Sequence, residues 1–248
     1  MEQKEILVTS TLDKTEQPSL FYGAVGAEKR PLLVGLHTWS FGRTNQIKNM
    51  LPFAEKHNFN LLLPEFRGPN LSDNPDCKKA CGSEFACQDV MDAINYVIEN
   101  ENVDRGNVFL LGASGGGMMA LLLVGKHPEK FKAVGAFVPV CDLVEWQKYG
   151  YQNHIIACCG SEEEMMRRSP VSYIDGIAKG NVKIFHGKHD PFVPREQSIS
   201  LYKALSDKYP DAKVYLDLFD GKHEMDMQLA EHWILQQYNK KEIIAVTY

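Results

Sequence analysis

The 248-residue sequence has no apolar run near the roughly 20 residues that a membrane-spanning helix needs. Its first residues, Met1 to Glu5, are polar, so no secretory leader is expected. Lysine and arginine are scattered rather than clustered, and the formal net charge is −5. These absences argue against a membrane or nucleic-acid partner, and they favour a soluble cytoplasmic protein.

Cysteine is too sparse and too irregularly spaced for a disulfide framework in a chain of this length without a leader. Reduced thiols are therefore expected, although a disulfide between Cys77 and Cys81 stays open. The spacing from Cys77 to Cys87 has no matching second pair of ligands, so neither a metal nor a cofactor is predicted. The six cysteines are Cys77, Cys81, Cys87, Cys141, Cys158 and Cys159.

An apolar content of 44% allows one α/β domain over residues 1–248. β-Branched apolar segments alternate with amphipathic ones, which predicts a mostly parallel eight-stranded sheet with helices on both faces and an antiparallel hairpin at its start. Strands are expected at Glu5–Ser10, Ser19–Val25, Pro31–His37, Asn60–Glu65, Asn107–Ala113, Ala133–Pro139, Val182–His186 and Lys213–Phe219. Helices are expected at Asn45–Lys56, Glu84–Asn100, Gly115–Lys126, Arg195–Lys208 and Glu224–Asn239.

Two regions interrupt this alternation. Residues 65–82 are rich in proline, glycine, asparagine and aspartate, which predicts a long loop. Residues 141–175 are longer than a single crossover helix requires and carry Trp146 and Tyr149. We expect this insertion to form a small cap, with both aromatic side chains contacting substrate. A solvated helix pair far from the site is the alternative.

The most informative segment is Gly112-Ala113-Ser114-Gly115-Gly116, between a predicted strand and a predicted helix. A Gly-x-Ser-x-Gly sequence in that position is typical of a nucleophile elbow, in which a sharp turn exposes the serine hydroxyl. Glycine is required on both sides because strand and helix approach each other closely. Ser114 is therefore the candidate nucleophile.

A serine hydroxyl needs a base and a group that orients the base. His223 follows the last predicted strand, at the carboxyl edge of the sheet where Ser114 is also expected. Asp190 follows the seventh strand at that edge, and Asp142, just after the sixth, is its rival. The order Ser, Asp, His favours Asp190. The remaining histidines are expected to pack, to lie on the surface or to shape loops: His37, His57, His127, His154, His186, His189 and His232.

Acyl transfer also needs hydrogen-bond donors for the oxyanion. The backbone amide of Gly115 is one candidate, because it opens the helix after the nucleophile. The second is expected in the loop after the third strand, where we favour the amide of Trp39 over that of Thr38. The Trp39 side chain is also expected to form an apolar wall for substrate.

With these motifs, the chain resembles the α/β-hydrolase superfamily, and specifically the catalytic domain of the prolyl oligopeptidase family and its stand-alone esterase relatives. The resemblance covers about residues 31–233. It rests on His37-Thr38-Trp39-Ser40, Asp89-Val90-Met91-Asp92-Ala93, Gly112 to Gly116, Ser169-Pro170-Val171, His186-Gly187 with Asp190 and Val193-Pro194, and Lys222-His223. It implies a Ser114, Asp190, His223 triad and a covalent acyl-enzyme intermediate.

The sequence also departs from the family pattern. No segment before Pro31 is long enough for the β-propeller of the family's peptidases, and the loop from His37 lacks the His-Gly-Gly-Gly form of many lipases. We therefore expect a serine hydrolase that acts on small soluble carboxylic esters. An aminopeptidase or oligopeptidase acting on short peptides is the alternative. A non-catalytic binding module is the alternative of another class.

Overall fold

The computed structural model describes residues 1–240, and its centre is one eight-stranded sheet in the order β1-β2-β4-β3-β5-β6-β7-β8. β1 pairs antiparallel with β2, and β2 pairs antiparallel with β4; the remaining neighbours are parallel. The initial hairpin and the eight strands predicted from sequence are confirmed. The strands are β1 Gln3–Thr9, β2 Glu16–Tyr22, β3 Arg30–Leu36, β4 Asn60–Pro64, β5 Val103–Ala113, β6 Ala133–Phe137, β7 Val182–Gly187 and β8 Val214–Phe219.

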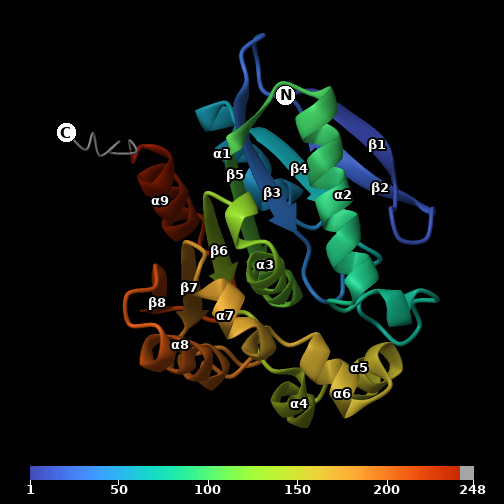
Figure 1. Ribbon diagram of the computed structural model, residues 1–248, viewed down its shortest axis with the longest axis vertical. Coiled ribbons are helices and arrows are strands. Elements are labelled where there is room, and N and C mark those ends of the chain that lie inside the picture. The colour runs from blue at the N-terminus through green and yellow to red at the C-terminus, as the bar shows by residue number, and fades with distance from the viewer. Residues whose placement is uncertain (241–248) are drawn as a thin grey trace.

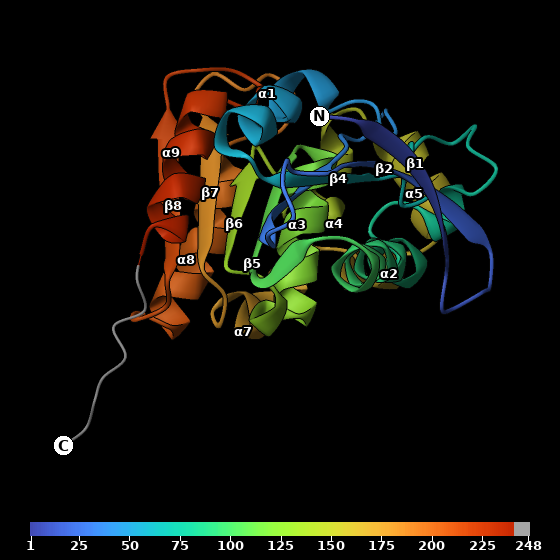
Figure 2. The ribbon, with the colours of Figure 1, turned by 90° about the horizontal axis from the view of Figure 1, so that it is seen from above.

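Helices cover both faces of the sheet (Figures 1 and 2). On one face, α1 and α9 bury Phe53, Ala230 and Trp233 against it. On the other face, α2, α3 and α8 supply the larger apolar cluster. These helices are α1 Ile47–His57, α2 Glu84–Asn100, α3 Gly115–Lys126, α8 Glu196–Lys208 and α9 Met227–Tyr238. The mostly parallel sheet with helices on both faces, expected from the alternating pattern, is present, as is the α/β-hydrolase architecture that the family resemblance implies.

The predicted insertion consists of short helices and 3₁₀ turns between β6 and β7. Figure 1 shows α4, α5 and α6 grouped at one end of the molecule. The elements are α4 Leu143–Trp146, η3 Gln147–Tyr149, α5 Gln152–Cys159, α6 Glu162–Arg167, η4 Pro170–Tyr173 and α7 Ile174–Ile177. Two further 3₁₀ turns are η1 Cys77–Lys79, inside the loop 65–82, and η2 Pro128–Lys130.

Some element boundaries differ from the sequence predictions for identifiable reasons. β5 begins at Val103 instead of Asn107, because Val103 pairs with Arg30 before a register shift. α9 begins at Met227 instead of Glu224, because the Asp226 carboxylate accepts hydrogen bonds from the first amides of the helix. His223 therefore lies in a loop. No helix within residues 1–240 combines the length and apolar character needed to cross a membrane.

Candidate active site

Ser114 lies in the sharp turn between β5 and α3. Its φ of 57° and ψ of −119° are unusual for a residue with a side chain, and backbone strain of this kind clusters at functional sites. The Ser114 amide donates a 2.9 Å hydrogen bond to the carbonyl of Phe137 at the end of the neighbouring strand β6. Strand and helix approach so closely that a β-carbon on Gly112 would lie 2.3 Å from the Gly116 oxygen. The glycines of the motif are thus required by the turn.

Gly116→Ala is expected to destabilise the fold by roughly 1–3 kcal/mol, as overpacking does in well-packed cores. The new β-carbon would lie 2.5 Å from the Leu36 oxygen and 2.7 Å from the His37 oxygen, and these backbone atoms cannot move aside cheaply. Urea unfolding followed by circular dichroism measures the effect. Gly106→Ala is the matched control, because only Asp104 lies near, at 3.4 Å. Equal stability of the two variants would contradict the packing argument.

The structure brings Asp190 and His223 together. Asp190 follows β7, His223 follows β8, and the His223 Nδ1 lies 2.7 Å from the Asp190 Oδ2. The two loops can approach because Gly187 has no side chain: a β-carbon there would lie 2.1 Å from the Lys222 oxygen. The His223 ring also packs edge-on against Phe192, with 5.3 Å between ring centroids. A carboxylate that holds one imidazole nitrogen leaves the other available for proton transfer.

The Asp190 carboxylate is fully buried and saturated with hydrogen bonds. Its Oδ1 accepts from the amides of Phe192 and Val193, at 2.8 and 3.0 Å. Burial raises the pKa of Asp190, but hydrogen bonds from His186, His223 and these two amides outweigh burial and hold the pKa well below its usual range. Asp190 is therefore an anion across the neutral pH range.

Asp142, the alternative acid, and His186, the histidine beside Asp190, make other contacts. The Asp142 Oδ1 accepts the Glu145 amide at 3.1 Å and so caps α4. The buried His186 lies with Nδ1 2.7 Å from the Ser198 hydroxyl and Nε2 2.9 Å from the Val193 oxygen. Its Nε2 is also 3.4 Å from Asp190 Oδ2. His186 thus shapes the loop that holds the acid, as the sequence suggested.

Ser114 follows the carboxyl end of β5, and the other two residues follow the carboxyl ends of β7 and β8 in the same parallel set. All three lie at one edge of the sheet. Among residues 1–240, however, the hydrogen bonds do not include one between Ser114 and His223. Catalytic hydrogen bonds are often long before substrate binds, so this geometry leaves the Ser114 contact as a prediction.

The backbone amides of Trp39 and Gly115 lie next to each other. A β-carbon on Gly115 would be 2.9 Å from the Trp39 nitrogen. The Thr38 amide, the sequence's alternative donor, already donates to the Asn45 Oδ1 at 3.0 Å. Within the described part of the chain the Trp39 amide has no acceptor, and the Gly115 amide is one of the four that a helix leaves free. The role of these two amides as oxyanion donors stays a prediction.

Three further residues hold this loop: Asn45, Asn70 and His37. Asn45 binds the Thr38 amide, and the Asn70 amide donates to the Trp39 oxygen at 2.7 Å. His37 stacks on Phe66 with 3.7 Å between ring centroids. Its ring nitrogens lie 2.9 and 2.6 Å from the oxygens of Thr38 and Glu65. Asn70 lies in the predicted loop, but only the tertiary contact reveals its partner.

The predicted substrate-binding side chains differ in exposure. Trp39 and Trp146 are 3% and 1% exposed, with their rings edge to face at 4.8 Å. The Trp146 indole donates to the Phe192 oxygen at 3.0 Å, so Trp146 packs between the insertion and the loop of Asp190. The indole nitrogen of Trp39 is buried and has no hydrogen-bond partner among residues 1–240. Tyr149 is exposed and lines a hollow of about 340 Å³ with Asp190 and Pro194.

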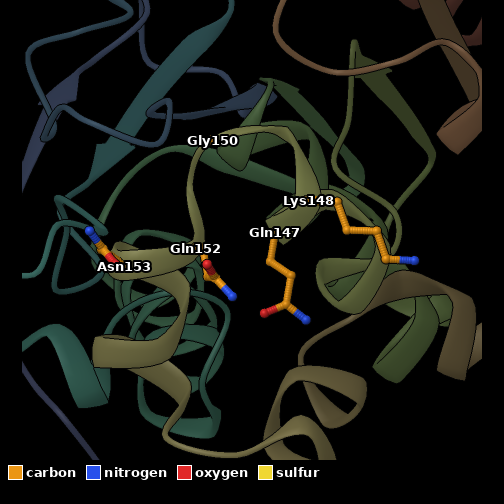
Figure 3. A pocket seen from close by; sticks show the side chains of 5 residues that line it. All are labelled: Gln147, Lys148, Gly150, Gln152 and Asn153. Atoms are coloured by element: carbon orange, nitrogen blue, oxygen red, sulfur yellow. The ribbon is translucent and has the colours of Figure 1, made fainter.

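A second hollow, of about 550 Å³, lies within the insertion and contains none of the predicted site residues. Figure 3 shows the Gln147 and Gln152 side chains reaching into the same space, while Lys148 points away. The lining is Gln147, Lys148, Gly150, Gln152 and Asn153.

The model of the prolyl oligopeptidase family matches residues 78–245. The acylamino-acid-releasing enzyme of Rattus norvegicus is 30% identical over 166 residues, which are 60% of this chain and 22% of that protein. Feruloyl esterase B of Neurospora crassa is 28% identical over 123 residues, 45% of this chain and 39% of that protein. The chain therefore spans less than a quarter of the length of the rat relative.

Among solved structures, a fluorophosphonate-binding serine hydrolase of Staphylococcus aureus aligns with a TM-score of 0.77 at 14% identity, covering 96% of this chain and 99% of that one. At this identity the likeness concerns the fold alone. The family match, in contrast, extends over more than half of the sequence and includes Ser114, Asp190 and His223. Together with the elbow after β5, it shows that this chain belongs to the prolyl oligopeptidase family, with the α/β-hydrolase fold.

Proposed function

We propose that the chain is a serine hydrolase that cleaves carboxylic esters of small soluble substrates, with Ser114, His223 and Asp190 as its triad. The observation that carries the proposal is the 2.7 Å contact between His223 and the buried Asp190, at the sheet edge where the elbow presents Ser114. Family membership and the named esterase relative support the same reaction class. No cofactor takes part in this reaction.

In the proposed reaction the Ser114 oxygen attacks the acyl carbonyl, while His223 Nε2 takes the hydroxyl proton. Asp190 holds the opposite ring nitrogen and stabilises the imidazolium that forms. The amides of Gly115 and Trp39 donate to the oxyanion. His223 then gives its proton to the leaving alcohol, and a water molecule, activated by the same histidine, releases the acid from Ser114.

We propose that residues 141–175 form a small cap and that substrate binds between this cap and the edge of the sheet. Tyr149 borders the hollow at the loop of Asp190, and Trp39 is proposed to form an apolar wall for substrate. Trp146 is proposed to act as the wall behind Trp39, because its own surface is buried. We further propose a cytoplasmic location, which suits the six free cysteines.

Labelling by a fluorophosphonate probe tests the proposal directly. The probe phosphonylates an activated serine, so one covalent adduct is expected, on the peptide containing Ser114. Mass spectrometry of a digest locates the adduct, and protein unfolded in urea is the control for non-specific reaction. A chain that folds but takes up no probe would instead be a binding module without hydrolase activity.

A peptidase acting on short peptides is the second candidate, favoured by the name of the rat relative and the family description. The two candidates share every proposed catalytic residue and differ in the leaving group. Parallel assays on p-nitrophenyl acyl esters and N-acylaminoacyl anilides separate them. We expect the ester kcat/KM to exceed the anilide value, and the reverse order would favour the peptidase.

A further inference from the structure

Four of the six cysteines gather where two distant segments meet. Cys77 and Cys81 belong to the loop before α2, and Cys158 and Cys159 end α5 in the insertion. The Cys77 thiol donates to the Ala157 oxygen at 3.7 Å. The Cys81 thiol contacts those of both Cys158 and Cys159. All four cysteines are free thiols.

The members of this thiol cluster are not equivalent. Cys81 is buried, whereas Cys159 is partly exposed and within reach of a small reagent. The hydrogen bond from Cys81, assisted by the positive charge of Arg168, lowers the pKa of Cys159 despite its partial burial. Burial instead raises the pKa of Cys77, the other partly exposed member. The contact with Cys81 lowers the pKa of Cys158 as well, but Cys158 is buried. Because the thiolate is the reactive form and must be reached by the reagent, Cys159 is the preferred nucleophile.

Arg168 also fixes the two segments relative to each other. Its guanidinium donates to the oxygens of Ala80 and Lys78, at 3.0 and 3.1 Å, and to the Glu164 carboxylate at 2.8 Å. The side chain is buried and joins α6 of the insertion to the chain just before Cys81. The thiols of Cys81 and Cys159 are thus held together by a contact independent of sulfur.

We propose that Cys81 and Cys159 are a site of reversible oxidation, and that oxidised glutathione or a similar small disulfide converts them into a disulfide bond. The Cys159 thiolate attacks one sulfur of the reagent and releases one glutathione thiolate. Cys81 then attacks the Cys159 sulfur of the mixed disulfide and releases the second. The two cysteine protons pass to the two released thiolates, so the protein loses two electrons and the reagent gains them.

The bond would tie the insertion to the loop that supports the proposed oxyanion site. The Cys81 amide donates to the Asn70 side chain at 2.7 Å, and the Asn70 amide donates to the Trp39 oxygen at 2.7 Å. Any effect on turnover rests on the proposed function, but disulfide formation itself does not involve Ser114. A metal is disfavoured, because residues 1–240 contain no group of three or more His, Cys, Asp or Glu side chains arranged to hold one.

The test uses the full chain, incubated with oxidised glutathione, blocked with N-ethylmaleimide and digested for mass spectrometry. We expect a linked pair of peptides that contain Cys81 and Cys159, reversed by dithiothreitol. Since a disulfide restricts the unfolded chain, the oxidised form should also melt at a Tm about 5–10 °C higher. Both readouts are independent of hydrolase activity.

Cys159→Ser should abolish the cross-link and the Tm shift. Cys87→Ser is the matched control: its buried thiol contacts Gly82 and Met119 outside the cluster, so both effects should persist. Cys158→Ser should likewise keep them. A cross-link that survives in Cys159→Ser, six unmodified thiols after oxidation, or a bound metal ion that protects the thiols would overturn the proposal.

Discussion

Ser114→Ala is expected to lower kcat for short p-nitrophenyl esters by roughly 10⁴-fold or more. The variant retains the oxyanion amides and the histidine but has no atom that can form the acyl intermediate. Steady-state assays with purified protein measure the loss, and the fluorophosphonate adduct should disappear with it. The residual hydrolysis should be the part of the rate enhancement that substrate binding and the oxyanion amides supply without a nucleophile.

A control must show that Ser114→Ala loses activity without losing its folded structure. Alanine keeps the β-carbon that serine already carries at φ 57°, so the strain of the elbow is unchanged. Circular dichroism and Tm should therefore match the parent chain. Ser206→Ala, at a partly exposed position of α8, should leave both kcat and stability unaltered. Parent-level turnover by Ser114→Ala would refute the assignment of the nucleophile.

Asp190→Asn should also lower kcat by roughly 10⁴-fold, by the precedent of serine proteases in which an amide replaces the acid. The amide cannot balance the imidazolium charge, and it favours the wrong tautomer of His223. KM should change much less than kcat, because Asp190 is buried and does not touch the substrate in the proposed mechanism. Measuring kcat and KM separately distinguishes this role from a general loss of structure.

Asp142→Asn is the matched control, since asparagine caps helices as well as aspartate does. It should retain activity if Asp190 is the acid, and a larger loss in Asp142→Asn than in Asp190→Asn would reverse the assignment.

The contact between Asp190 and His223 also affects how the stability of the fold depends on acid pH. Because the pKa of folded Asp190 lies below its unfolded value, the stabilisation is present above about pH 4 and is lost as the pH falls further.

The fold was predictable because its signals are local. Each strand is a short β-branched or apolar run bounded by turn formers. The helix α2 matches its predicted bounds because Ser83 caps it and its apolar residues are periodic, and α3 begins where predicted because the elbow motif fixes its start. The start of α9 differs because of a local cap by Asp226, but the start of β5 depends on a distant partner: Val103 joins β5 only because Arg30 lies beside it. A single sequence carries no sign of that pairing.

The sequence by itself determined the elbow at Ser114, the order of the candidate acid and base, and the family resemblance. Only the tertiary structure showed that Asp190 contacts His223 while Asp142 caps α4, and that Asn45 already binds the Thr38 amide. It also revealed the thiol cluster of Cys77, Cys81, Cys158 and Cys159. The reason is physical: local sequence sets each turn, whereas sheet order and loop packing determine which distant side chains meet.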